Sequence, residues 1–200
     1  AEQGESFEVQ VKARLTDDAQ VLSVIESKAV TVIRDVHYHQ YDTYFMFADP
    51  SQGRLRYRED EFLGPDGKST HVRARLTLTG PAKEDAFDSV VLSRSRFLAP
   101  ATYSLRFYRE YFNPTSERPI EKDRRRWLVV FHGVEVFVNL DRLIKPEGEG
   151  YYVEIKARTW SRRDAKEKAL VMRELLALFG AGPDQIVTED YTEIVASNHP

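Results

Sequence analysis

The sequence predicts an α+β protein in which about eight antiparallel strands form a closed β-barrel, or tunnel, with helices packed on the outside. Segments that alternate between apolar and polar residues dominate the 200-residue chain, which is typical of strands. Their order along the chain favours antiparallel pairing. Because no linker-like stretch divides the sequence, we expect a single domain over residues 1–200.

Composition indicates a folded, soluble protein. Hydrophobic residues make up 42% and charged residues 30% of the chain, and the formal net charge is −3. This balance gives no sign of nucleic-acid or membrane partners, and no apolar run approaches the 18 or so residues that span a bilayer. Cysteine is absent, which excludes thiol chemistry and fits a cytoplasmic location. We expect a monomer or homodimer.

The first half of the chain alternates strands with turns. Residues 7–15 predict a strand, and Thr16 is a candidate N-cap for a short helix over 17–28. Residues 31–46, rich in β-branched and aromatic residues, predict a long strand. A turn at 49–53 leads into a strand at 54–60, and GPDGKS at 64–69 predicts a hairpin turn before a strand at 70–80.

The second half adds helices. AKEDAFDSVVL (82–92) is read as a helix, and the aromatic segment 103–112 and a loop at 113–119 follow. Strands are predicted at 120–131, 132–144 and 151–160. Ser161 then caps a helix with Asp164 at its third position, an apolar stripe along one face, and Gly180 at its end. A short helix near 190–196 ends the pattern.

Five predicted strands place their cations on one side. Lys12 and Arg14, for example, lie opposite Val9, Val11 and Ala13. The other cations on such faces are Arg54, Arg56, Arg58, Arg73, Arg75, Lys122, Arg124, Arg126, Lys156 and Arg158. A solvated outer face would explain one such strand, but it explains five poorly.

If helices cover the apolar faces, the cationic faces line the interior of the closed sheet. Two like charges about 6 Å apart repel by roughly 3 kcal/mol at an effective dielectric of 20. An anionic, multiply charged guest would relieve this repulsion, and polyphosphate can accept charge-assisted hydrogen bonds from many guanidinium groups.

Three acidic residues lie among these cations. Glu8, Glu154 and Asp141 either form salt bridges or hold Mg²⁺ or Mn²⁺ against the phosphates, since hard cations bind carboxylate and phosphate oxygens together. The sequence leaves both interpretations open.

At this point the sequence resembles a family, the CYTH or triphosphate tunnel metalloenzymes, which includes class IV adenylyl cyclases, thiamine triphosphatases and inorganic triphosphatases. Glu8, Gln10 and Lys12 match its N-terminal E-x-E-x-K strand. Further matches, in the family's order, are QYDTYF (40–45), LRYR (55–58), LTLTGP (76–81), IEKDRRRW (120–127), NLDRL followed by GYYVEIK (139–156), and DYTEI (190–194).

The resemblance implies an eight-stranded tunnel that binds a triphosphate on basic side chains and a divalent metal, Mg²⁺ or Mn²⁺, on acidic ones. The metal ligands would be Glu8, Gln10, Asp141 and Glu154, and the catalytic residues Glu8, Lys12 and Glu154. The phosphate-binding residues would be Lys12, Arg56, Arg58, Arg75, Lys122, Arg124, Arg126 and Lys156.

Three positions depart from the family pattern. Gln10 replaces the second N-terminal glutamate, Lys156 replaces the second acid of the late E-x-E pair, and Thr79 replaces a frequent lysine. Gln10 can still offer a carbonyl oxygen, but the Lys156 ammonium cannot ligate a metal. We therefore expect one metal, with Lys156 taking the place of a second.

The most direct expectation is metal-dependent hydrolysis of an inorganic or organic triphosphate, a small-molecule substrate. One alternative is a class IV-type adenylyl cyclase, which would use the same walls and metal. The other is a domain that binds triphosphate or polyphosphate without turnover, because Gln10 and Lys156 replace expected acids.

Overall fold

The computed structural model describes residues 7–79, 83–87, 90–94 and 97–198. Its strands form one antiparallel sheet, in the order β5-β6-β1-β10-β9-β8-β2-β3-β4-β7, with β11 paired to β1. The strands are β1 (Phe7–Leu15), β2 (Thr31–Met46), β3 (Arg54–Leu63), β4 (Ser69–Thr79), β5 (Lys83–Phe87), β6 (Val90–Arg94), β7 (Phe97–Pro100), β8 (Ser116–Phe131), β9 (Val134–Lys145), β10 (Tyr151–Thr159) and β11 (Ile186–Val187).

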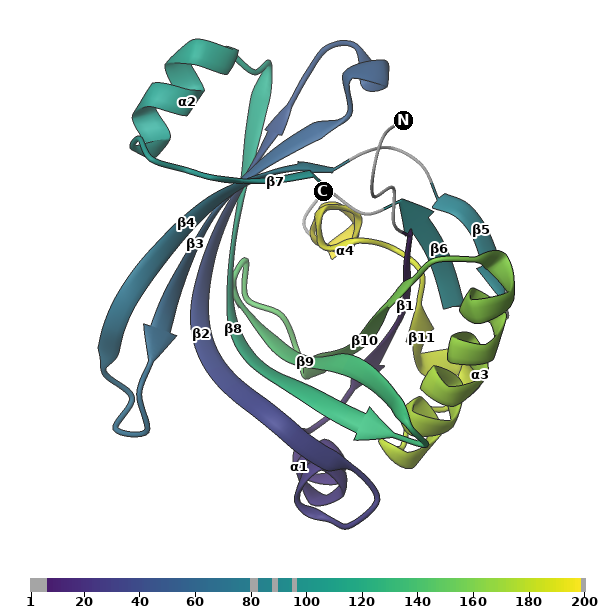
Figure 1. Ribbon diagram of the computed structural model, residues 1–200. Helices are drawn as coiled ribbons and strands as arrows, with labels where there is room; N and C mark the ends of the chain where they lie inside the picture. The colour runs from purple at the N-terminus through teal and green to yellow at the C-terminus, as the bar shows by residue number, and fades with distance from the viewer. Residues whose placement is uncertain (1–6, 80–82, 88–89, 95–96, 199–200) are drawn as a thin grey trace.

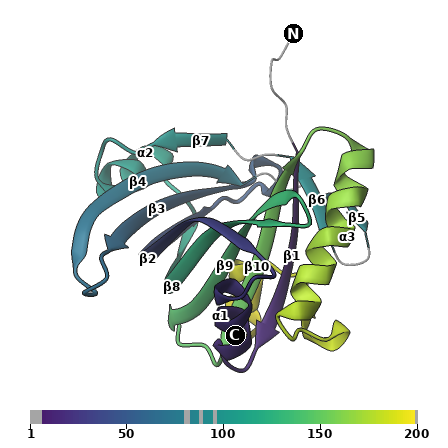
Figure 2. The same cartoon turned by 60° about the horizontal axis from the view of Figure 1, so that its bottom comes forward.

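The sheet curls round to give the tunnel shape seen in Figure 1, and the elongated strands are seen from another side in Figure 2. Four α-helices accompany it: α1 (Ala19–Glu26), α2 (Leu105–Phe112), α3 (Arg162–Leu178) and α4 (Tyr191–Asn198). Short 3₁₀ turns span Pro50–Gln52 and Pro183–Gln185. The predicted α+β fold, an antiparallel sheet accompanied by helices, is confirmed.

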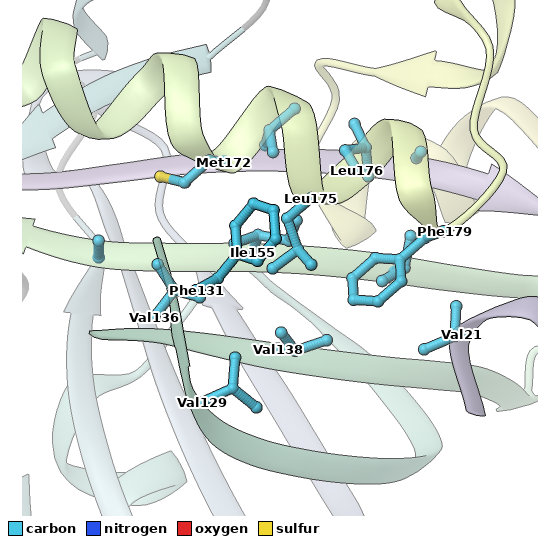
Figure 3. Packing of buried hydrophobic residues seen from close by; sticks show 14 of the residues in the cluster. Val21, Val129, Phe131, Val136, Val138, Ile155, Met172, Leu175, Leu176 and Phe179 are labelled. Atoms are coloured by element: carbon cyan, nitrogen blue, oxygen red, sulfur yellow. The ribbon is translucent and has the colours of Figure 1, made fainter. Parts of the chain in front are cut away.

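The main apolar core lies outside the tunnel, between the sheet and α3. Figure 3 shows Met172, Leu175, Leu176 and Phe179 of α3 directed at apolar side chains of the strands. The predicted helix cap is confirmed, because Ser161 Oγ accepts a hydrogen bond from the Asp164 amide at 3.1 Å. Burial of this stripe fixes which face of the sheet is apolar, and the period of two leaves the other face polar.

Helix α4 departs from the predicted outside placement. It lies on the concave side of the sheet (Figure 1), where Tyr191, Ile194 and Val195 pack with inward residues of four strands. Those strand residues are Tyr44, Ile120, Leu143 and Tyr152. The C-terminal helix therefore fills one end of the tunnel with apolar side chains.

Two segments differ from the sequence prediction. Residues 83–87 and 90–94 form the strands β5 and β6, so the helix predicted over 82–92 is wrong where the chain is described. Val91 and Leu92 pair with Gln10 and Val9 on the edge of β1, and this tertiary pairing outweighs a helical pattern. Residues 105–112, to which the pattern assigned no helix, form α2.

Helix α2 has its own small core, because Tyr108 packs with Phe45, Leu55 and Tyr57 on the outer face of β2 and β3. Helix α1 begins at Ala19, after Asp18, so the predicted cap at Thr16 is wrong. The sheet also has more strands than expected, and the single-domain organisation stays a prediction. In the part of the chain described, no helix is long and apolar enough to span a membrane.

Gly150 provides a test of how tightly β10 meets the end of β1. Its φ is +71°, and a Cβ placed there would lie 2.3 Å from the Leu15 carbonyl oxygen. We expect Gly150→Ala to lower the free energy of unfolding by about 3 kcal/mol, from backbone strain plus a clash with rigid backbone. Urea unfolding measures this.

The matched control is Gly67→Ala, in the turn between β3 and β4. Gly67 has φ of +75°, and nothing lies within 4 Å of the position that an alanine methyl group would take. Only the conformational strain of about 1 kcal/mol therefore applies. Equal losses in the two variants would contradict the close contact at Gly150.

Candidate functional site: a buried cationic cluster in the tunnel

Five of the predicted phosphate-binding residues are buried on the concave face. Their exposed fractions range from 0% for Lys122 to 7% for Arg56. They come from β1, β3 and β8, on the parity that points away from the α3 core, and the five are Lys12, Arg56, Arg58, Lys122 and Arg124. The alternation seen in the sequence thus reflects an interior, not a solvated, face.

A carboxylate that the site prediction missed holds two of these cations together. Asp42 of β2 accepts two hydrogen bonds from Arg58, at 2.6 and 2.8 Å, and one from Lys122 Nζ at 2.9 Å. Burial alone would raise the pKa of Asp42, but Arg58 and Lys122 hold it well below its usual value. Asp42 is therefore a permanent anion that fixes both cations in place.

Asp141, a predicted metal ligand, is engaged in the same way. Both of its oxygens accept hydrogen bonds from Arg124, each at 2.6 Å, and the Tyr191 hydroxyl of α4 also donates to it. Asp141 and Arg124 are direct partners in the β8–β9 register. This bidentate pair leaves Asp141 little capacity to bind a metal.

Glu154 lies within reach of several cations on neighbouring strands. Lys156 Nζ is 3.2 Å from its Oε1, Lys12 Nζ is 3.8 Å from its Oε2, and Arg124 Nη2 is 3.9 Å from Oε1. Burial would raise the pKa of Glu154, but Lys156, Lys12 and Arg124 hold it well below its usual value. Glu154 is therefore ionised throughout the neutral range.

A fourth carboxylate, Asp60 of β3, organises the next part of the wall. It accepts hydrogen bonds from Gln40 at 2.7 Å, from Arg73 at 2.9 Å and from Arg75 at 2.8 Å. The predicted phosphate-binding residue Arg75 is partly exposed to solvent, with 25% of its side chain accessible. It can therefore reach both Asp60 and a ligand in the tunnel.

Arg126 is placed differently from the ion-paired cations described above. Within the described residues it forms no ion pair, and its guanidinium lies 4.0 Å from the ring centroid of Phe137. Burial, with Arg124 adding to it, lowers the pKa of Arg126 to about 10, so it stays charged at neutral pH. A partly buried guanidinium without a carboxylate is a ready anion-binding group.

Lys122 is the cation most affected by its surroundings. Burial, together with Arg58 and Arg124, lowers its pKa to about 7 against the opposing effect of Asp42. Its ammonium also lies 4.6 Å from the Tyr191 ring centroid, and that of Lys12 lies 4.1 Å from the same ring. The end of α4 thus contacts the cationic cluster directly.

The predicted metal ligands fit one cation only in part. Glu8 and Glu154 converge on the Lys156 ammonium, at 3.8 and 3.2 Å, which marks a position where a positive charge is held between two carboxylates. Gln10 is the register partner of Lys156 on β1. These donors suit one hard cation that takes the place of the ammonium, whereas Asp141 does not fit.

Asn139 is a better fourth donor than Asp141. Its Nδ2 donates to Glu154 at 3.2 Å, and its buried Oδ1 has no hydrogen-bond partner in the described part of the chain. As the side chains stand, no three His, Asp or Glu residues among those described are grouped closely enough to hold a metal. An ion would therefore need Lys156 to move aside.

The outer face of the same strands carries a cavity of about 290 Å³ that is separate from the cationic cluster. It is lined by His37, Asp123, Arg125, Leu140, Arg142 and Tyr151. His37 pairs with Asp123 at 2.7 Å, so this histidine is accounted for by a local contact.

The residues that sequence reasoning missed are mostly uncharged or acidic partners of the cations. Asp42, Asp60, Gln40 and Asn139 are all buried. A signal did exist, since Tyr38, Gln40, Asp42 and Tyr44 share one parity of β2, and Asp42 pairs with Arg58 once the β2–β3 register is known. The register itself could not be read from the sequence.

No family model matches this chain, and no curated protein matches it. Solved structures do. The PH1819 protein of Pyrococcus horikoshii matches with a TM-score of 0.69 at 19% identity, over 96% of this chain and 99% of that one. A putative adenylate cyclase of Vibrio parahaemolyticus matches with a TM-score of 0.65 at 15% identity, over 96% and 99%.

A chain of the Schizosaccharomyces pombe Mediator head module matches with a TM-score of 0.61 at 12% identity, over 86% of this chain and 96% of that one. At such identities the likeness concerns the fold. The chain shares the fold of these solved structures, and the curled antiparallel sheet with helices agrees with the fold that the resemblance to the CYTH family implied. Fold alone does not assign an activity.

The lowered pKa of Lys122 gives a pH test. A lysine with a pKa of about 7 loses its charge above that pH, whereas a bound polyanion favours the charged form. We expect the affinity for inorganic triphosphate to fall by up to about tenfold per unit as pH rises above 7, with proton uptake on binding. Calorimetry in two buffers of different ionisation enthalpy measures that uptake.

Lys122→Gln should abolish the proton uptake, while Lys145→Gln, at an exposed lysine, should retain it. Uptake that persists in Lys122→Gln would show that another group titrates.

Proposed function

We propose that this chain binds a triphosphate in the tunnel and hydrolyses its terminal phosphoanhydride, with Mg²⁺ or Mn²⁺ as the metal. The observation that carries the proposal is Arg126, a site guanidinium with no carboxylate partner among the described residues, beside the buried cations Arg124 and Lys122. If the acidic residues of the chain neutralised every cation of the cluster, the cluster would not attract an anionic ligand. Arg126, on the interior face, is instead offset only at longer range, by Glu154.

The cationic walls supply most of the catalysis in this proposal. Arg56, Arg58 and Lys122 would donate hydrogen bonds to the phosphoryl oxygens and stabilise the charge that develops on them. Because Asp42 fixes two of these donors before the substrate arrives, little reorganisation is needed. The tunnel holds the phosphate chain so that water can attack the terminal phosphorus in line.

Water would form the new bond to phosphorus as the bridging P–O bond breaks, and the bonding electron pair would stay on the bridging oxygen of the departing phosphate chain. The proton lost by the water would pass to that oxygen, and phosphate would be released. Glu8 or Glu154 would orient the water, and Lys12 would neutralise charge beside them. The bound divalent ion, held by Glu8, Gln10, Glu154 and Asn139, would supply further charge neutralisation on the phosphates.

Two alternatives rest on specific observations. The fold likeness to the Vibrio parahaemolyticus protein favours a cyclase, in which a ribose hydroxyl would attack the α-phosphorus. Lys156, placed between two carboxylates, favours a domain that binds triphosphate without turnover.

One assay separates the three functions. Purified protein is incubated with inorganic triphosphate, ATP and thiamine triphosphate in Mg²⁺ or Mn²⁺, and released phosphate and cyclic AMP are measured. Phosphate release supports the hydrolase, and cyclic AMP with pyrophosphate supports the cyclase. Thermal stabilisation without any product supports the binding domain.

Arg126 and Arg125 are adjacent residues on opposite faces of β8, which gives a matched pair for the mechanism. Arg126→Ala should lower kcat/KM for triphosphate by about a hundredfold, as expected when one electrostatic stabiliser is lost. Arg125→Ala, on the outer face, should leave it within about twofold. Because Arg126 has no ion pair to break among the described residues, we expect Arg126→Ala to lower the free energy of unfolding only slightly. Equal kcat/KM values in the two variants would contradict the role of Arg126.

Lys156 should compete with the metal for Glu8 and Glu154. Removing its charge in Lys156→Gln leaves the two carboxylates facing each other, so we expect the affinity for Mn²⁺ to rise by about tenfold or more. Calorimetric titration of Mn²⁺ without substrate measures this. Lys168→Gln, which removes a lysine near Asp164 on α3, is the control, and unchanged Mn²⁺ affinity in Lys156→Gln would contradict the cation position.

A further inference from the structure

Helix α2 carries a row of exposed aromatic side chains. Tyr103, which precedes the helix, and Phe107 and Tyr111 within it are spaced four residues apart and share one face. Their exposed fractions are 60%, 44% and 73%. The ring centroids of Tyr103 and Phe107 are 4.5 Å apart, and those of Phe107 and Tyr111 are 6.0 Å apart with planes at 10°. We call these three residues the aromatic row.

The aromatic row is not what attaches α2 to the sheet. The opposite face of the helix does this, through Tyr108, which is buried with Phe45, Leu55 and Tyr57. Single exposed apolar residues are ordinary on a protein surface, whereas a contiguous exposed patch marks an interaction site. Figures 1 and 2 both show α2 at the margin of the molecule, far from α3. Another protein can therefore approach this helix.

An ion pair lies along one side of the aromatic row. Arg106 Nε donates to Glu110 Oε1 at 2.8 Å, and the two side chains are 82% and 66% exposed. At about 100° per residue, both lie on the same side of Phe107. The order of the charges is the one that the helix dipole disfavours, because the cation is in the first turn and the anion in the last. Stability of the isolated helix therefore does not explain their placement.

This face is complementary to itself when two helices run antiparallel. Across a two-fold axis at Phe107, that ring would meet its own counterpart in the second copy, and Tyr103 would meet the counterpart of Tyr111. On the flank, Arg106 would face the counterpart of Glu110, and the reverse. Parallel helices would instead bring like charges together. An isologous interface requires this kind of self-complementarity.

The size of the face sets the strength of the association. At about 200 Å² for a whole aromatic side chain, the aromatic row exposes roughly 350 Å² in each copy. With the ion pair included, two copies would bury roughly 1,000 Å² in total, near the lower limit for a specific interface. We therefore expect a reversible dimer with a Kd in the micromolar range, of about 1 to 100 μM.

We propose that the aromatic row and the Arg106–Glu110 pair form an interface between two copies of this chain, with their α2 helices antiparallel across a two-fold axis near Phe107. Aromatic side chains with a flanking arginine are the residues that contribute most to protein interfaces. The proposal is independent of the proposed function, because α2 packs on the outer face of β2 and β3 and the cationic cluster lies on the concave face.

The test reverses one charge at a time and then mixes the variants. Arg106→Glu makes all the flanking charges negative in both copies, and Glu110→Arg makes them all positive. Each variant should weaken its own dimer by at least about tenfold, because like charges then face each other. An equimolar mixture of the two variants should form a heterodimer about as tightly as the wild type dimerises. Sedimentation velocity at protein concentrations from about 1 μM to 0.5 mM measures all of these, a range that brackets the expected Kd.

The matched control is Arg163→Glu, which reverses one charge of the exposed i,i+4 pair with Glu167 on α3 and should leave dimerisation unchanged. Tyr111→Ala should weaken the wild-type dimer by about tenfold, the loss of one aromatic contact. Restoration on mixing also shows that the charge variants are folded.

A wild-type protein that stays monomeric over the whole concentration range would overturn the inference. So would a dimer that Arg106→Glu and Glu110→Arg leave intact, because it would use another surface. A mixture of the two variants that stays monomeric would exclude the antiparallel pairing.

Discussion

The structure depends on like charges that are forced to face one another. Folding the apolar faces of the strands against α3 leaves the polar faces directed inward, where Arg58, Lys122 and Arg124 lie among other cations. Their repulsion is offset by carboxylates on neighbouring strands, above all Asp42 and Asp141. Buried pairs of this kind add little net stability, but losing one partner is expensive. They hold the cations in fixed positions without cancelling all of the charge.

Much of the fold could be predicted from the sequence, because it follows from periodicity. The period of two placed the cations on one face, and the capped, striped helix at 162–178 placed the apolar core on the other. The strands β5 and β6 were missed because their pairing is tertiary: β6 pairs with the edge of β1, and β5 pairs with β6. Helix α4 was expected outside because its own pattern does not show which surface of the sheet receives it. Both depend on contacts distant in sequence.

The cations of the site could be predicted from the sequence, but the side chains that contact them could not. Lysines and arginines were identified by parity alone, whereas Asp42 and Asn139 gain their importance from register, which fixes what lies opposite them. The cations demand an anionic guest less strongly than their number suggested, since the chain supplies several acids of its own. What remains is a local excess of positive charge around Arg126. The bidentate pairing of Asp141 with Arg124 could not be foreseen from residue type alone.

The position of α4 gives the concave face two unlike ends. Tyr191, Ile194 and Val195 cover one end with apolar contacts, so under the proposed function a ligand would enter and a product would leave at the other end. A long polymer of phosphate would then present only its terminus. The fragment formed nearest α4 would have to wait until the other had gone.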